Sequence, residues 1–225
     1  FFRAATNNDV ENKYGYRYGK WLTASLYAKC EFVGVSKGDS SCKVEYAYDL
    51  PNLQDEKVHL VYEVYGDGKI IVDMSYQPVV SEIEMPVFGL IFQLYKDMEE
   101  VNYYGFGPEE NYIDRNKGAL LGKYTYQVTD NLTPYLYPQE CGNRTHVREL
   151  SVAGENTKLK IKGEDFEFSA LHYTPYELEN ARHKDELPNV YQTVLCINEK
   201  QMGVAGDDTW GAKTHDEFLL DKEKH

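Results

Sequence analysis

The chain has 225 residues, 42% of them hydrophobic, which is enough for the core of one large all-β domain or of two small ones. It carries 24 Lys and Arg against 37 Asp and Glu, and the net charge of −13 argues against nucleic acid and anionic membranes as partners. The sequence contains no apolar run as long as a membrane span.

In the first third of the chain, the pattern predicts one helical segment followed by strands. Residues 18–27 are predicted to form a short helix or turn. Residues 42–48 alternate between apolar and polar side chains, as a half-buried strand does. Residues 58–64 and 70–76 read as two strands joined by the turn Gly66-Asp67-Gly68, and so predict a hairpin.

In the remaining chain, residues 78–86 interrupt the strand pattern, which resumes at 88–94 and again at 166–171 and 191–197. The run Thr174-Pro175-Tyr176-Glu177 predicts a helix start, with a capping Thr, Pro in the first turn and Glu at the capping-box position. We expect this helix to end near Ala181. Sustained strand signals without alternating helices favour an all-β fold of sheet packed on sheet.

The cysteines are scattered, without a Cys-x-x-Cys pair, which argues against zinc and against a disulfide framework: Cys30, Cys42, Cys141 and Cys196. Free thiols predict a cytoplasmic protein. The glycosylation sequons at 131–133 and 143–145 would have a meaning only in a secreted protein.

The most informative segment is the glycine-rich run Met202-Gly203-Val204-Ala205-Gly206-Asp207-Asp208-Thr209-Trp210-Gly211. Asp207 and Asp208 are turn residues whose side chains bond nearby backbone groups. Trp210 either packs into the core or is offered to a ligand, since an indole face suits a sugar ring. The residues alone favour the packed interpretation.

This run resembles the Gly-Asp-Asp-Ser-Trp signature of the last domain of lac-type β-galactosidases, which form part of glycoside hydrolase family two. Three further segments agree with that domain in order and spacing: Phe2-Arg3-Ala4-Ala5-Thr6-Asn7-Asn8-Asp9, Gly105-Phe106-Gly107-Pro108-Glu109-Glu110-Asn111-Tyr112-Ile113-Asp114-Arg115 and Tyr135-Leu136-Tyr137-Pro138-Gln139-Glu140-Cys141-Gly142. The resemblance extends from Phe1 to about Leu220. It also fits the small subunit of heterodimeric β-galactosidases.

The resemblance implies a single domain over residues 1–225 with the galactose-mutarotase-like supersandwich fold. That fold consists of two large antiparallel sheets with one or two short helices. Because the chain begins within a motif and lacks strands that precede it in the family, we expect a fragment of a larger β-galactosidase chain with exposed sheet edges.

For catalysis, a retaining glycosidase needs two carboxylates about 5–5.5 Å apart. Adjacent pairs such as Asp207 with Asp208, or Glu109 with Glu110, do not by themselves make such a pair. In the family, the catalytic glutamates and most ligands of the essential magnesium and sodium ions lie in a barrel domain. The resemblance therefore implies no catalytic residue, metal ligand or cofactor site in this chain.

The resemblance does imply contributions to a substrate pocket. Trp210 matches a tryptophan that reaches the mouth of the barrel and stacks on the sugar or aglycone, which favours the ligand-facing interpretation. Asn8 and Asp9, with the stretch to Tyr16, match a motif and a mobile loop that closes over substrate. Glu11 stands where relatives often have Gly, and Asp9 has an equally good alternative as a capping residue.

Six motif residues are predicted to hold loops in place: Glu110, Asn111, Arg115, Glu140, Asp207 and Asp208. We expect Glu110 and Asn111 to bond loop backbone. We expect Arg115 to pair with a carboxylate such as Asp114 or Glu140, because a guanidinium matches a carboxylate in bidentate fashion.

The leading hypothesis is the non-catalytic carboxyl-terminal domain, or small subunit, of an oligomeric enzyme that hydrolyses terminal β-galactosides such as lactose with retention. It would complete the substrate pocket beside a catalytic barrel domain or large subunit. The alternatives are a carbohydrate-binding module and an aldose 1-epimerase (mutarotase), which needs a general acid and a general base. The epimerase candidates are His59, His146, His172, His183 and His215, with Glu149 or Glu217.

Overall fold

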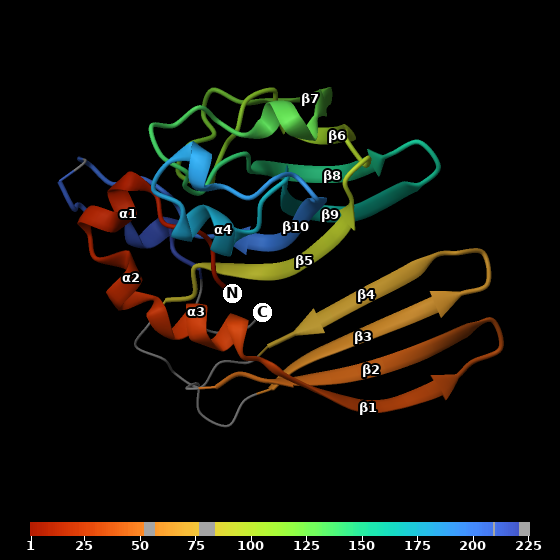
Figure 1. The fold of residues 1–225 in the computed structure, drawn as a ribbon. Coiled ribbons are helices and arrows are strands. Elements are labelled where there is room, and N and C mark those ends of the chain that lie inside the picture. Colours follow the sequence, from red (N-terminus) through yellow and green to blue (C-terminus); the bar gives the residue numbers. More distant parts are fainter. Residues whose placement is uncertain (52–56, 77–83, 209, 221–225) are drawn as a thin grey trace. The chain divides into compact units, whose positions relative to one another are not determined.

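The computed structural model describes residues 1–51, 57–76, 84–208 and 210–220 (Figure 1). The described residues form one four-stranded and one six-stranded antiparallel sheet, together with a few short helices. The predicted all-β class is confirmed. The chain divides into two compact units, the first built mainly from residues 17–84 and the second from residues 2–16 and 85–220. That residues 1–225 form one supersandwich domain stays a prediction.

The first unit contains the four-stranded sheet, with its strands in sequence order. They are β1 (Lys29–Lys37), β2 (Ser41–Asp49), β3 (Lys57–Tyr65) and β4 (Ile70–Ser75). The predicted strand at 42–48 and the predicted hairpin are confirmed. The strand β1 was not predicted; its register against β2 shifts between Phe32 and Gly34, which interrupts the alternation on which the prediction depends.

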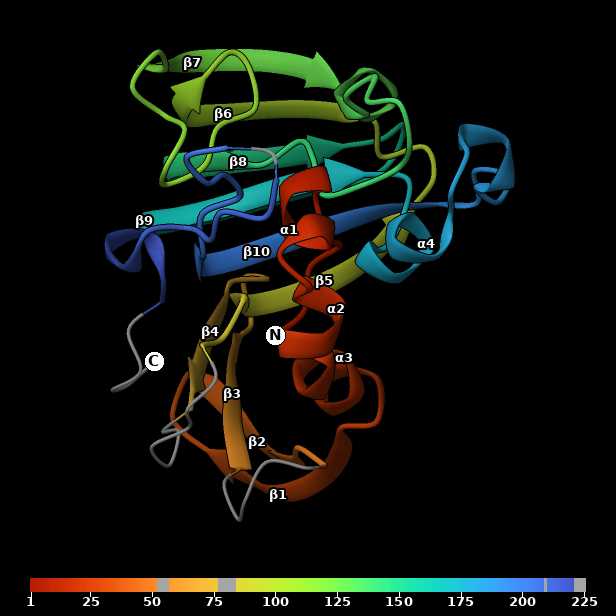
Figure 2. The same cartoon turned by 90° about the vertical axis from the view of Figure 1, so that its left-hand side faces the viewer.

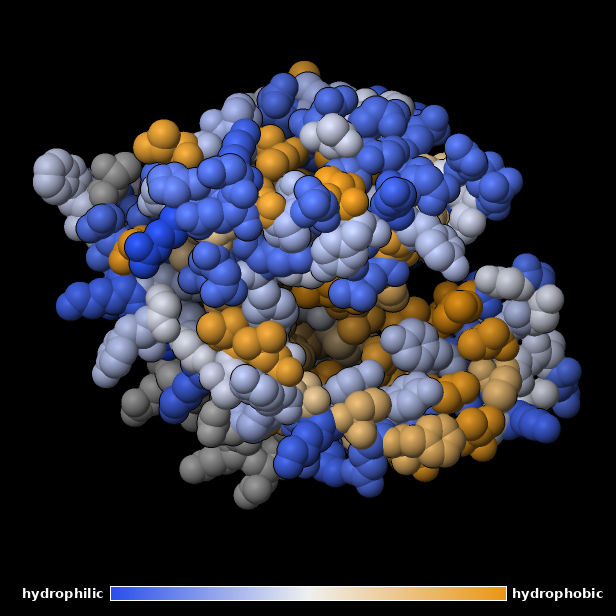
Figure 3. All heavy atoms as spheres, in the orientation of Figure 1, coloured by the Kyte–Doolittle hydropathy of each residue, from blue (hydrophilic) through white to orange (hydrophobic). Residues whose placement is uncertain are grey.

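Alternation gives this sheet one apolar face and one polar face. Phe32, Tyr46, Leu60 and Met74 lie opposite one another across the four strands. Aromatic rings reinforce the row, with the centroids of Phe32 and Tyr46 5.9 Å apart. Figure 3 shows apolar side chains gathered over these strands. The predicted helix at 18–27 is confirmed as α3 (Gly19–Leu26).

The second unit contains the six-stranded sheet in the order β5-β10-β9-β8-β6-β7, which can be followed in Figure 2. Its strands are β5 (Val87–Tyr95), β6 (Glu100–Gly107), β7 (Leu120–Gln127), β8 (Arg144–Ala153), β9 (Lys158–Leu171) and β10 (Gln192–Gln201). The predicted strands at 88–94, 166–171 and 191–197 are confirmed as parts of β5, β9 and β10. The strands β6, β7 and β8 were not predicted, because glycines weaken the strand signal of β6 and β7 and charged residues that of β8.

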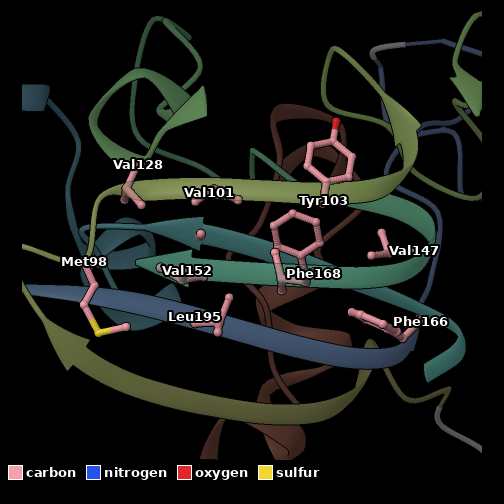
Figure 4. Packing of buried hydrophobic residues seen from close by; sticks show 11 residues of the cluster. Met98, Val101, Tyr103, Val128, Val147, Val152, Phe166, Phe168 and Leu195 are labelled. Atoms are coloured by element: carbon pink, nitrogen blue, oxygen red, sulfur yellow. The ribbon is translucent and has the colours of Figure 1, made fainter. Parts of the chain in front are cut away.

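The core of the second unit lies on one face of this sheet, where buried side chains from the four strands β6, β8, β9 and β10 meet (Figure 4). Val101, Val147, Val152, Phe168 and Leu195 have no measurable exposure. Tyr103 packs edge-to-face on Phe168, with ring centroids 5.3 Å apart. The sheet is therefore a rigid base for the loops that connect its strands.

Several of these loops contain short helices. The helix α4 (Pro175–Asn180) begins with the predicted capping box, because Thr174 Oγ1 accepts the Glu177 amide and Glu177 bonds back to Thr174. The helices α1 (Asn7–Glu11) and α2 (Tyr14–Arg17) were not predicted. The described residues also contain three short 3₁₀ helices: Val128–Asn131, Lys184–Glu186 and Asp216–Phe218.

The packing of the core predicts how two identical substitutions differ. Leu150 is 2% exposed on β8, whereas Leu136 is 90% exposed in a loop. We expect Leu150→Ala to lower the free energy of unfolding by about 2–5 kcal/mol, because it leaves a cavity. Leu136→Ala should change it by less than about 0.5 kcal/mol. Urea unfolding of the two variants checks the difference, and equal effects would contradict this core.

Candidate substrate-facing loop

The glycine-rich segment forms a loop that is fixed at its start. The amide of Gly203 donates to the Phe218 carbonyl at 2.8 Å, and that of Ala205 donates to Asp114 Oδ2 at 2.7 Å. These bonds join the loop to Phe218, which lies 15 residues later in the chain, and to the turn that follows β6. The loop therefore leaves the sheet in a defined direction.

The tip of the loop is a turn closed by Asp208. Its Oδ1 accepts the amides of Trp210 at 2.8 Å and Ala212 at 3.2 Å, as predicted for a turn-forming aspartate. Gly211 has a φ of +106°, and a Cβ at Gly206 would lie 2.3 Å from the Ala212 carbonyl oxygen, so both positions require glycine. Thr209 lies outside the described residues.

Trp210 is 88% exposed, so its indole is not part of the core of this chain. Because hydrogen bonds from backbone amides to Asp208 hold the turn, the exposed indole is a pre-positioned apolar surface. Asp207 belongs to the same loop, and its Oδ1 lies 2.8 Å from Nε2 of His215. The hydrogen bond and negative charge of Asp207 raise the pKa of His215.

The helix α1 lies against this loop. The Asn8 side-chain amide donates to the Ala212 carbonyl at 3.1 Å, and a Cβ on Gly211 would lie 3.0 Å from the Glu11 carbonyl oxygen. Asn8 is buried at 8% exposure, and Oδ1 of its side chain makes no hydrogen bond. The two segments matched to a substrate pocket are therefore neighbours, although about 200 residues separate them.

Asp9 is fully buried and has a structural role. Its Oδ2 accepts the Thr6 amide at 2.9 Å, while Thr6 Oγ1 accepts the Asp9 amide at 3.2 Å. This capping box starts α1 and supports the capping interpretation of Asp9. The same Oδ2 lies 2.6 Å from Nη1 of Arg3, whose Nη2 donates to the Gly203 carbonyl at 3.2 Å. Sequence reasoning assigned no role to Arg3, although it stands in the Arg-Ala motif.

Arg115 pairs with a carboxylate, as predicted, but the two carboxylates named as examples were wrong. Arg115 Nη2 lies 2.5 Å from Glu110 Oε1, not beside Asp114 or Glu140. A tight turn, in which Tyr112 and Arg115 exchange backbone hydrogen bonds, folds the arginine back towards Glu110. Asp114 instead bonds the loop amide of Ala205, as described above.

Glu110 joins two of the matched segments. It accepts hydrogen bonds from the Gly142 amide at 2.7 Å, from Thr133 Oγ1 at 2.7 Å and from the Tyr135 hydroxyl. Burial alone would raise the pKa of this carboxyl, but these donors and Arg115 outweigh it and lower the pKa. The predicted bonding of Glu110 to loop backbone is confirmed.

Asn111 is bonded to backbone on both sides of its amide, as predicted. It donates to the carbonyls of Phe106 and Glu109 and accepts the Thr145 amide at 3.0 Å. Arg144, a buried residue that sequence reasoning missed, ties the next loop by donating to Gly142 and Asn131. Its position inside a sequon gave no signal of this role.

Glu140 and Glu167 are two buried carboxyls without a salt bridge in the described part of the chain. Burial raises the pKa of Glu140 to about 7, although the charge of Arg3 opposes the shift. Burial likewise raises the pKa of Glu167 to about 8, against a 3.0 Å hydrogen bond from Asn143. Gln201 Nε2 donates to Glu140 at 3.2 Å. Both groups are buried, at 8% and 6% exposure.

The four matched segments therefore converge. Arg3 bonds Gly203, the Asn7 amide donates to Gln139 Oε1 at 3.2 Å, and Glu110 bonds Gly142. These contacts bring residues 2–9, 105–115, 135–142 and 202–211 into one network. Exposed apolar side chains stand on the same loops: Val10, Tyr16, Leu136 and Trp210.

Of the histidines considered for epimerase chemistry, His172 and His146 are bonded to other groups of the protein. His172 is buried, with Nδ1 2.9 Å from the Gln192 carbonyl and Nε2 2.8 Å from Glu99. His146 Nδ1 lies 3.1 Å from Asp165. His59 is exposed on β3 in the first unit, and His183 precedes the 3₁₀ helix Lys184–Glu186.

Within the described ranges, no three His, Cys, Asp or Glu side chains are grouped as metal ligands, and no helix has the length and apolarity needed to cross a membrane. The four cysteines are free thiols. The sequon asparagines Asn131 and Asn143 are 7% and 0% exposed, so neither amide is accessible in the folded protein.

The fold is an all-β platform on which the four motifs form one connected network, and an exposed indole stands on one of the loops of that network. A sequence model of the family described as "Beta galactosidase small chain" matches residues 1–225. The chain belongs to this β-galactosidase small chain family.

Comparison with individual proteins agrees with this family assignment. The chain is similar to a β-galactosidase of Streptococcus thermophilus, with 40% identity over 223 residues, which cover 98% of this chain and 22% of the relative. A β-galactosidase of Halalkalibacterium halodurans is 39% identical over 226 residues, again 22% of its length. A β-galactosidase small subunit of Latilactobacillus sakei is 30% identical over 255 residues, 98% of this chain and 79% of the relative. The chain thus spans about a fifth of the first relatives and most of the small subunit.

Buried Glu140 and Glu167 predict that the folded chain loses stability as pH rises. Their pKa values are raised from 4.5 to about 7 and about 8, so across this window the folded chain keeps protons that the unfolded chain has released. The free energy of unfolding should therefore fall, by at most about 1.4 kcal/mol per pH unit for each carboxyl. Urea unfolding at about pH 5 and about pH 8 measures the slope.

Glu167→Gln should flatten this dependence, because the amide keeps the shape of the side chain and cannot ionise. Glu164→Gln, at an exposed position three residues away, is the matched control and should leave the slope unchanged. The same slope in both variants would show that Glu167 ionises normally in the folded state.

Proposed function

We propose that this chain is the non-catalytic carboxyl-terminal domain, or the small subunit, of a retaining β-galactosidase of glycoside hydrolase family two. Its role is to complete the substrate pocket of a catalytic barrel domain or large subunit and to support assembly of the oligomer. The observation that carries the proposal is Trp210, an exposed indole on a loop fixed to Asp114 and to α1.

The distribution of carboxylates supports the non-catalytic role. Asp9, Asp114, Glu110 and Asp208 each bind backbone amides within the chain. Carboxylates committed to holding loops do not provide the open nucleophile and acid/base pair of a retaining glycosidase. The catalytic glutamates and the magnesium and sodium ions then belong to the partner.

The partner would cover the loops around Trp210. Val10 and Tyr16 on one side and Leu136 on the other are 54%, 91% and 90% exposed, and their segments are linked through Asn7 and Gln139. Apolar side chains concentrated on connected loops are typical of a protein interface. The first relatives contain about four fifths of their length beyond the matched part, which leaves room for a catalytic domain.

We prefer this function to the mutarotase and carbohydrate-binding-module alternatives because the relatives are β-galactosidases or a small subunit. Hydrolysis of terminal β-galactosides such as lactose, and a cytoplasmic location, are part of the proposal. The four free cysteines fit a reducing compartment.

The first expectation is that the purified chain alone does not hydrolyse a chromogenic β-galactoside, because the catalytic pair belongs to the partner. Addition of the catalytic portion of the enzyme should restore turnover. Turnover that co-purifies with this chain after rigorous removal of host enzyme would contradict the non-catalytic role.

The second expectation concerns Trp210→Ala in the complete enzyme. Loss of ring stacking should raise KM for lactose, by a free energy on the order of 1–3 kcal/mol if sugar stacking resembles the stacking of bases on aromatic rings. A contact made in the ground state acts first on KM. Steady-state kinetics and thermal unfolding measure the two effects.

Two further variants distinguish the loss of ring stacking at Trp210 from the loss of any exposed aromatic side chain. Trp210→Phe keeps a ring and should recover most of the affinity. Tyr95→Ala removes a ring that is 73% exposed on β5 and should leave KM unchanged. An unchanged KM for Trp210→Ala would remove the indole from the substrate pocket.

A further inference from the structure

The outer face of β6, β7, β8 and β9, opposite the core of the second unit, has an ordered arrangement of polar side chains. Two rows cross the four strands in register. One row is Lys123, Tyr104, Glu149 and Lys162, and the other is Thr125, Asn102, Ser151 and Lys160. Directly opposed residues on neighbouring strands lie about 5 Å apart, so the two rows form a continuous platform.

The platform is hollowed. A depression of about 330 Å³ is lined by members of both rows, Tyr104 among them. The guanidinium of Arg148 lies 5.8 Å from the centroid of the Tyr104 ring and supports it. Thr125 Oγ1 donates to Asn102 Oδ1 at 2.6 Å, and Asn102 Nδ2 donates to Glu100 Oε1 at 2.8 Å; the two bonds orient the central amide and leave its second N–H available.

The charge of this face is opposite to that of the chain. Around the two rows, its outward positions carry five cations and two carboxylates: Lys123, Arg148, Lys158, Lys160 and Lys162, with Glu100 and Glu149. Asp165 and Glu167 also face outward, nearer the other end of β9. The whole chain has 24 Lys and Arg against 37 Asp and Glu. A local excess of cations on an anionic protein attracts and holds anions at this face.

Some of these cations are available to a ligand. Glu149 Oε1 lies 2.8 Å from Nζ of Lys162, and that contact and the nearby charge of Lys123 lower the pKa of Glu149. Among the residues that the structure describes, Lys123, Lys158 and Lys160 form no ion pair. Neutral hydrogen-bonding groups of Asn102 and Ser151 lie in the second row, between Thr125 and Lys160.

We propose that this platform binds a monosaccharide that carries an anionic group. The charge complementarity selects the anion, which the ammonium groups of Lys160 and its neighbours on β9 would hold. The neutral row of Asn102, Ser151 and Thr125 offers both donors and acceptors to sugar hydroxyls. The site is on the sheet, away from the Trp210 loop, and does not depend on the proposed role of that loop.

The test is calorimetric titration of the full chain with four probes: glucose 6-phosphate, glucuronate, glucose and inorganic phosphate. Either anionic sugar should bind at least about tenfold more tightly than both glucose and inorganic phosphate, since only it uses both kinds of contact. Binding should weaken with added salt. Equal affinities for all four probes, or no dissociation constant below about 10 mM for either anionic sugar, would overturn the proposal.

Variants locate the site. The double variant Lys123→Gln/Lys160→Gln should weaken binding of the anionic sugar at least about tenfold, while Glu149→Gln should strengthen it by releasing Lys162. Lys184→Gln, an exposed lysine elsewhere in the second unit, is the matched control. All these side chains are on the surface, and a thermal melt confirms folding. Binding that survives the double variant unchanged places the ligand elsewhere and refutes the proposal.

Discussion

The buried ion pair between Arg3 and Asp9 is the interaction on which the loop side of the second unit depends. The two side chains are 2% and 0% exposed, with Nη1 and Oδ2 2.6 Å apart. Removing either partner would leave an unpaired charge inside the protein, which is strongly destabilising. Arg3 also bonds the Gly203 carbonyl, and Tyr14 donates to the Arg3 carbonyl at 3.1 Å. One pair thus fixes the amino-terminal segment, α1 and the start of the Trp210 loop.

In the second unit the sheet provides the hydrophobic core and the loops carry the exposed side chains. The sheet buries apolar side chains on one face and gives the loops fixed points of attachment. On the loops, carboxylates that look catalytic in the sequence are used to bind backbone amides, as Glu110 does at Gly142 and Asp208 at the tip of the Trp210 turn. What remains free to meet another molecule is an exposed indole and the apolar side chains near it. Under the function that we propose, these side chains contribute shape and contact to an active site, and the partner contributes the reacting groups.

Charge is also divided within the chain. The net charge of −13 describes an average and conceals the cationic outer face of β6 to β9. Alternation along β9 produces this contrast, because Lys158, Lys160 and Lys162 point outward while Leu159 and Ile161 pack against the core. The buried carboxyls Glu140 and Glu167 add a dependence on pH that no exposed carboxyl would give.

The sequence by itself determined the features that depend on neighbours within a few residues. The β3–β4 hairpin, the Thr174 capping box and the Asp208 turn follow from local sequence patterns. The four motifs identify the family. The tertiary structure decided the rest. Arg115 pairs with Glu110 because a turn redirects its side chain, and Arg3 meets Gly203 across 200 residues. The strands β6, β7 and β8 are stabilised by pairing despite weak propensities. Partners distant in the chain, and the burial they create, exist only once the sheet has brought them together, so no local pattern encodes them.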